Sequence, residues 1–97
     1  MEHTEAALAR ACTALWAATL SLMTAFMQTQ APAHRYLMAR KIAANFDLLR
    51  IQPCYTTATR ASFDRLATRW GTKADQLSPH ADKSRGGGFG WRTLLRG

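Results

Sequence analysis

The residues that could do chemistry in this chain are few and far apart. It holds two cysteines, Cys12 and Cys54, and three histidines, His3, His34 and His80. No two of them are three or four residues apart, the spacing at which a helix presents two metal ligands on one face. The cysteines also lack the number and spacing of a disulfide framework. The sequence therefore predicts two reduced thiols and no metal site.

Acid–base and nucleophilic catalysis find no support in the sequence either. The acidic residues that follow residue 34 are never paired on a helix face, so they suggest no acid–base couple. Cys54 and His34 would act as nucleophile and base only if the fold brought them together. The glycine-rich segment 86–90 lacks the preceding strand and the following Lys-Ser/Thr of a phosphate-binding loop. We predict that the protein is not an enzyme and uses no cofactor or small-molecule substrate.

Charge divides the chain into two regions. No charged residue lies between Arg10 and Arg35, whereas residues 34–97 carry twelve Lys/Arg against four Asp. Such a positive balance favours encounters with nucleic acid, anionic lipid or an acidic protein. The candidate contacts to an anionic partner are the basic residues of the third expected helix, Arg60, Arg65, Arg69 and Lys73. An ordinary solvated helix face is the alternative explanation for the same four side chains.

The uncharged region raises the question of localisation. Its apolar part, 11–27, is at the lower end of the length of about 20 residues that a membrane-spanning helix needs. The segment 31–33 resembles the cleavage site of an export signal, but Glu2 and Glu5 oppose the positive N-terminal region of such signals. We therefore predict a cytoplasmic protein, with membrane association of this helix and a cytoplasmic basic part as the alternative.

The periodicity of the same region is more informative than its hydropathy. On a helical wheel the small and polar residues fall on one narrow stripe, while the larger apolar side chains cover the remainder. The stripe consists of Arg10, Thr13, Ala17, Ser21, Thr24 and Gln28. This pattern is typical of a helix mostly buried in a bundle, and it also fits a membrane helix that packs closely against another. The buried helix is the favoured interpretation.

Capping residues and prolines predict three helices, over about 4–28, 33–50 and 56–70. Pro32 marks the break between the first two helices, and Pro53 ends the second. Gly71 follows the third helix and is expected to provide its left-handed C-cap. No segment shows the alternation of a β-strand, and the chain contains no valine.

These helices predict an all-α fold, a small three-helix antiparallel bundle with a long apolar first helix. Residues 1–71 would form the helical domain and residues 72–97 a flexible basic tail. The expected core residues are Leu15, Leu22, Phe26, Met38, Ile42, Phe46, Leu49, Phe63, Leu66 and Trp70. In the tail, Trp91, Leu94 and Leu95 form a short apolar face that could dock on a partner.

The function predicted from this pattern is interaction or assembly. Leu8, Leu15 and Leu22 recur every seven residues and, together with Phe26, form the expected interaction face of the first helix. Its partner would be another protein or a second copy of the chain. Membrane association through residues 11–27 and nucleic-acid binding through the basic region are the two alternatives.

Overall fold

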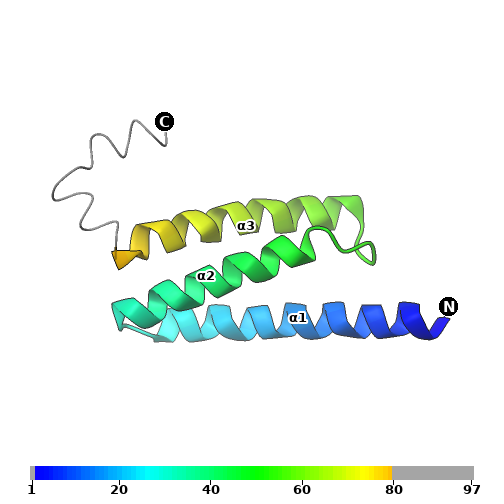
Figure 1. Ribbon diagram of the computed structural model, residues 1–97, viewed down its shortest axis with the longest axis horizontal. Coiled ribbons are helices and arrows are strands. Elements are labelled where there is room, and N and C mark those ends of the chain that lie inside the picture. The colour runs from blue at the N-terminus through cyan, green and yellow to red at the C-terminus, as the bar shows by residue number, and fades with distance from the viewer. Residues whose placement is uncertain (1, 80–97) are drawn as a thin grey trace.

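The fold is described from a computed structural model, which places residues 2–79 of the chain. Within that range the chain forms three helices and no strand: α1 over Glu2–Gln28, α2 over Pro32–Leu49 and α3 over Thr57–Leu77. The connection between α1 and α2 is short, so the two helices run antiparallel, and α2 lies between α1 and α3 (Figure 1). The predicted three-helix antiparallel bundle is confirmed. The predicted docking residues of the tail, Trp91, Leu94 and Leu95, lie outside the described residues.

The helices begin and end where the local chemistry favours it. Pro32 occupies the first turn of α2, where its missing N–H has no intrahelical partner to lose. The Thr56 hydroxyl accepts a hydrogen bond from the Thr59 N–H at 3.1 Å and so caps the start of α3. At the end of α1, the Arg35 guanidinium donates hydrogen bonds to the carbonyls of Phe26 and Thr29, at 3.0 and 2.9 Å. A cation at this position also complements the negative end of the α1 dipole.

The centre of the core is the contact between α2 and α3. Ile42, Phe46 and Leu49 of α2 are completely buried, and their spacing places them on one face of the helix. Phe63 of α3 lies against them, with its ring centroid 5.9 Å from that of Phe46. Smaller residues, Ala39 on α2 and Ala67 and Ala74 on α3, complete the buried face and allow the two helices to approach closely.

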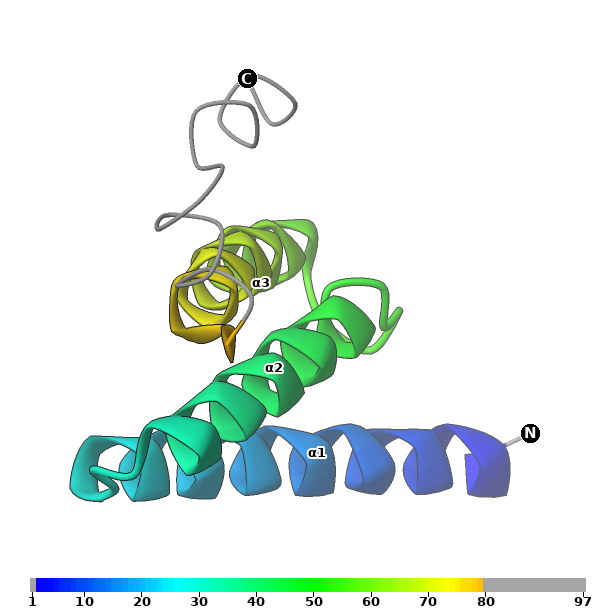
Figure 2. The same cartoon turned by 60° about the vertical axis from the view of Figure 1, so that its left-hand side comes forward.

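α1 is attached to this core mainly by aromatic side chains. The Trp16 ring lies 5.8 Å from that of Phe46 and 5.3 Å from that of Phe63. Nearer the C-terminal end of α1, the Phe26 ring meets the Trp70 ring edge-on at 5.0 Å. These contacts hold α1 in place, but α2 crosses α1 obliquely, so the N-terminal end of α1 diverges from the other two helices (Figure 2).

The predicted core residues all lie in or against the observed core. Phe26, Ile42, Phe46, Leu49 and Phe63 are buried. The other five pack against that cluster while keeping part of their surface in solvent: Leu15, Leu22, Met38, Leu66 and Trp70. Two aromatic members were missed, Trp16 and Tyr55. Tyr55 lies in the connector, where no helical period marks it, whereas Trp16 stands at helical spacing between Cys12 and Phe26, a spacing that the prediction did not use.

One predicted boundary is wrong. α3 does not end at Trp70 but continues through Gly71 to Leu77, and Gly71 does not take the left-handed conformation expected of a C-cap. The apolar spacing of α3 continues past the glycine, with Ala74 buried and Leu77 packed on the core. Burial of these two residues offsets the cost of about 1 kcal/mol of a glycine inside a helix. The segment 72–77 therefore belongs to the helix and not to a tail.

Candidate functional site

The outward face of α1 is the most unusual surface of the described chain. α1 is long and apolar enough to cross a membrane, yet only 11% of its most apolar window, within Thr4–Gln28, is buried against the rest of the protein. The burial predicted for the first helix is therefore not provided by this chain's own helices. Two short neighbours cover one side of a long helix and leave the other sides in solvent.

Small side chains dominate this exposed face. Five exposed residues recur at alternating steps of four and three, and we call them the small-residue stripe: Ala7, Ala11, Ala14, Ala18 and Ser21. The neighbouring part of the helix surface forms a shallow hollow lined by Arg10, Thr13 and Ala17, among others. Along a helix, residues with this spacing lie on one line, and small ones let a second helix approach closely.

Two larger apolar residues of α1 are also exposed, on the far side of the predicted polar stripe from the small-residue stripe. Leu20 retains 45% and Met27 78% of its maximal accessible surface. The predicted polar residues Thr13, Ser21 and Thr24 are also exposed, and the Thr24 hydroxyl donates back to the Leu20 carbonyl at 3.1 Å. The Thr24 hydroxyl therefore has a hydrogen-bond partner within its own helix.

The predicted interaction face of α1 divides between interior and surface. Phe26 is buried, with the Arg35 guanidinium 3.9 Å above its ring. Leu15 and Leu22 are half-buried and pack against the core. Only Leu8 is exposed, and it lines a groove between α1 and the connector that follows α2. Three of the four predicted residues thus contact this protein's own core. The exposed face of α1 instead includes the small and polar stripe recognised in the sequence, all of whose residues are exposed.

The four basic residues predicted to contact an anionic partner do not all lie on one surface. Arg65, Arg69 and Lys73 share an exposed face of α3, where Arg65 and Arg69 line a shallow hollow with Ser62. Arg60 points elsewhere and is half-buried, with its guanidinium directed to the Thr57 hydroxyl at 3.4 Å. Arg65, Arg69 and Lys73 therefore form one solvated basic face of α3, and Arg60 is not part of it.

The two cysteines, which sequence analysis treated separately, are brought together. Cys12 on α1 is buried, Cys54 on the connector between α2 and α3 is exposed, and their sulfur atoms are 2.8 Å apart. The Tyr55 hydroxyl donates a hydrogen bond to the Cys12 carbonyl at 3.2 Å, and the Tyr55 ring lies edge-on to Phe63. The connector is therefore anchored both to α1 and to the core at this position.

Burial changes the acidity of this cluster. Desolvation by burial, together with the hydrogen bond and the charge of the neighbouring Cys54 thiol, raises the pKa of the Cys12 thiol to about 11. The pKa of Tyr55 is raised by burial and by the two adjacent thiols. Cys12 is therefore a protonated thiol at neutral pH.

The other chemistries considered from sequence are not assembled by the described residues. His34 lies in the first turn of α2, and Cys54 lies in the connector that follows the end of α2. The hypothetical nucleophile and base are therefore at opposite ends of that helix. Within the described range, no group of three or more His, Cys, Asp or Glu side chains is placed to hold a metal ion. Comparison with protein-family models, with curated proteins and with solved structures found no match for this chain.

Proposed function

We propose that this protein is a small non-enzymatic assembly protein that pairs with a second copy of itself through the exposed face of α1. The observation that carries the proposal is the low burial of α1: a long apolar helix of which only 11% of the most apolar window is fully buried in its own chain. An apolar surface of this length is stabilised when another apolar surface removes it from water.

The small-residue stripe supports a helix as the covering element. Its steps of four and three residues repeat every seven, the period at which two helices keep the same faces in contact. Alanine and serine at those positions allow backbones to approach closely. Because the pattern is the same in every copy, two α1 helices present matching surfaces, as a twofold-symmetric interface requires.

The distribution of charge is compatible with self-pairing. Pairing through the small-residue stripe from Ala11 to Ser21 would bury no charged side chain of that segment, because it contains none; the nearest charge is the exposed Arg10, which lines the hollow beside the stripe. The basic residues of the described chain lie mainly on α2 and α3, where Arg40 and Lys41 of α2 and Arg65, Arg69 and Lys73 of α3 are exposed. The positive field of the protein therefore does not have to be desolvated when two α1 helices meet.

Membrane association is the competing candidate, because α1 is long and apolar enough to cross a bilayer. Spanning in the observed fold would carry Arg40 and Lys41 of the adjacent α2 to membrane depth, at a cost of several kcal/mol for each charge. Spanning with α2 detached would separate Trp16 and Phe26 from their aromatic partners. Protein pairing leaves these contacts intact, and for this reason we favour it.

The test is the oligomeric state of the full chain and of two matched variants. We expect the wild-type protein to be a dimer at tens of micromolar by sedimentation or light scattering. Ala14→Glu places a charge in the middle of the stripe and should produce a monomer with unchanged helical content. Ala61→Glu makes the same change at an exposed position of α3 and should leave the dimer intact.

A wild-type protein that stays monomeric at these concentrations would contradict the proposal. Flotation with vesicles of phosphatidylcholine and phosphatidylglycerol separates the competing candidate. Wild-type protein that floats with vesicles, resists high-salt and carbonate washes, and is released by Ala14→Glu would replace self-pairing with membrane association.

A further inference from the structure

The thiol pair, Cys12 and Cys54, is an unexpected product of the fold. The residues are 42 positions apart in sequence and belong to different elements, yet their sulfur atoms are 2.8 Å apart. The bond in a disulfide is about 2.05 Å long, so the pair needs less than about 1 Å of further approach to bond. Within residues 2–79 these are the only two cysteines, and neither is bonded in the structure.

The surroundings of the thiol pair hold it in this arrangement. The hydrogen bond from Tyr55 to the Cys12 carbonyl ties the connector to α1 one residue beyond Cys54. The Gln52 side chain of the connector links α2 to α1. Its amide donates to the Leu48 carbonyl of α2 at 2.9 Å, and its oxygen lies 3.8 Å from the Cys12 sulfur of α1. The proximity of the thiols therefore rests on several contacts and not on one free side chain.

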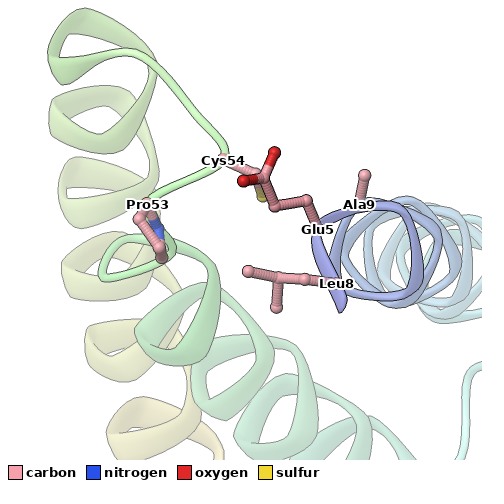
Figure 3. Close-up of a pocket in the computed structure, with 5 residues that line it drawn as sticks. All are labelled: Glu5, Leu8, Ala9, Pro53 and Cys54. Carbon is pink, nitrogen blue, oxygen red and sulfur yellow. The ribbon is translucent and has the colours of Figure 1, made fainter. Parts of the chain in front are cut away.

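The two thiols differ in access to solvent. Cys54 is exposed in a groove of about 400 Å³ formed by α1 and the connector, together with Glu5, Leu8, Ala9 and Pro53 (Figure 3). Cys12 lies behind it and retains 4% of its accessible surface. A small disulfide reagent can thus reach Cys54 directly, whereas Cys12 can be reached only through Cys54.

We propose that Cys12 and Cys54 form a reversible intramolecular disulfide that fastens α1 to the connector between α2 and α3 under oxidising conditions. The bond would act at Cys12, in the N-terminal half of α1, where the helix meets the connector. From there towards its N-terminal end the helix diverges from α2 and α3 (Figure 2). Residues 4–11, which precede Cys12 on α1, are all exposed. The disulfide would therefore fasten α1 covalently at the last buried position before its exposed N-terminal segment.

The reaction is thiol–disulfide exchange with an external disulfide, such as glutathione disulfide. The Cys54 thiolate attacks one sulfur of the reagent, forms a mixed disulfide, and releases the first reagent thiol. The Cys12 sulfur, deprotonated as it reacts, then attacks the Cys54 sulfur and releases the second reagent thiol. The protein loses two electrons and two protons, which leave on the two reagent thiols. Excess reduced thiol reverses both steps.

The order of these steps follows from the structure. Burial and the adjacent thiol keep Cys12 protonated at neutral pH, so it is a poor first nucleophile. Once Cys54 carries the mixed disulfide, the Cys12 sulfur lies next to its target and needs no encounter. The mixed disulfide should therefore be short-lived in the wild-type protein.

The experiment equilibrates the full chain with oxidised and reduced glutathione, quenches with acid, alkylates free thiols and determines the products by mass spectrometry. We expect wild-type protein to lose the mass of two hydrogen atoms, to take up no alkylating agent and to carry no glutathione. Its thermal unfolding midpoint should rise by roughly 10 to 20 °C on oxidation. In concentrated urea, the ratio of intramolecular disulfide to glutathione adducts should fall about tenfold or more, because the fold no longer holds the sulfurs together.

Two variants report on the order of reaction. Cys12→Ala should accumulate glutathione on Cys54, because the resolving thiol is absent. Cys54→Ser changes an exposed side chain, leaves the core intact and should keep Cys12 unmodified under the same conditions. If Cys12→Ala does not fold, the oxidation products of the wild-type protein and of Cys54→Ser still test whether the intramolecular disulfide forms. Stable glutathione on Cys54 of the wild type, or a disulfide-linked dimer as its main oxidation product, would overturn the proposal.

Discussion

The α2–α3 pair and α1 differ in how much of their apolar surface is buried within the chain. α2 and α3 are rich in charged residues, yet they contribute the fully buried Ile42, Phe46 and Leu49 and the buried Phe63. α1 has no charge from Ala11 to Gln28, yet its most apolar window is only 11% buried. Mean hydropathy therefore does not predict burial here. Large side chains at helical spacing identify the core. The long, alanine-rich and uncharged segment of α1 instead remains mostly exposed.

The largest effect is expected at the centre of the α2–α3 contact. Phe46→Ala should lower the free energy of unfolding by about 3 to 5 kcal/mol, because it leaves a cavity beneath Trp16 and Phe63. Urea denaturation measures the change. Leu48→Ala, at a half-exposed position on the same helix, is the control and should cost much less. A loss below about 1 kcal/mol for Phe46→Ala would show that the α2–α3 contact is not the core.

A smaller loss is expected where α1 joins that core. Trp16→Ala should cost about 2 to 4 kcal/mol, because the half-buried ring contacts both Phe46 and Phe63. Hydrogen exchange should show reduced protection in α1 while α2 and α3 stay protected. The control is Leu20→Ala on the exposed side of α1. Equal loss of protection in all three helices would remove the distinction between α1 and the α2–α3 pair.

The next effect concerns the end of α1. Arg35→Ala should cost about 1 to 2 kcal/mol, because it removes two hydrogen bonds to α1 carbonyls, a favourable charge at the helix dipole and the contact over Phe26. Thermal unfolding measures it. The control is Arg40→Ala, which removes an exposed arginine from α2, the helix that also carries Arg35. It should change the free energy of unfolding by less than about 0.5 kcal/mol. Similar values for the two variants would mean that Arg35 does not cap α1.

The smallest effect has the opposite sign. Gly71→Ala should raise the free energy of unfolding by about 0.5 to 1 kcal/mol, because Gly71 is inside α3 and an added Cβ meets nothing within 4 Å. Urea denaturation again measures the change. Destabilisation would indicate a left-handed glycine at this position, and hence a helix that ends at Trp70 and contributes less to the α2–α3 contact.

Much of the fold could be predicted because its signals are local. Prolines 32 and 53 mark the interruptions between helices, and the spacing of Ile42, Phe46 and Leu49 identifies the buried face of α2. The end of α3 could not be predicted in the same way. Gly71 has the local preference of a helix terminus, but Ala74 and Leu77 find apolar partners only once α2 is in place. A tertiary contact overrides a local preference at that position.

The candidate sites depend even more on the tertiary structure. The sequence by itself determined that the first helix is long, apolar and uncharged, and that no ligand spacing suggests a metal or an active site. Only the tertiary structure decided that α2 and α3 cover one side of that helix, so that the small-residue stripe remains exposed. Only it placed Cys54 beside Cys12, because the meeting of residues 42 positions apart depends on how α2 crosses α1 and not on any local preference. Periodicity predicts which face of a helix is apolar, whereas the length and direction of the neighbouring helices determine how much of that face is covered.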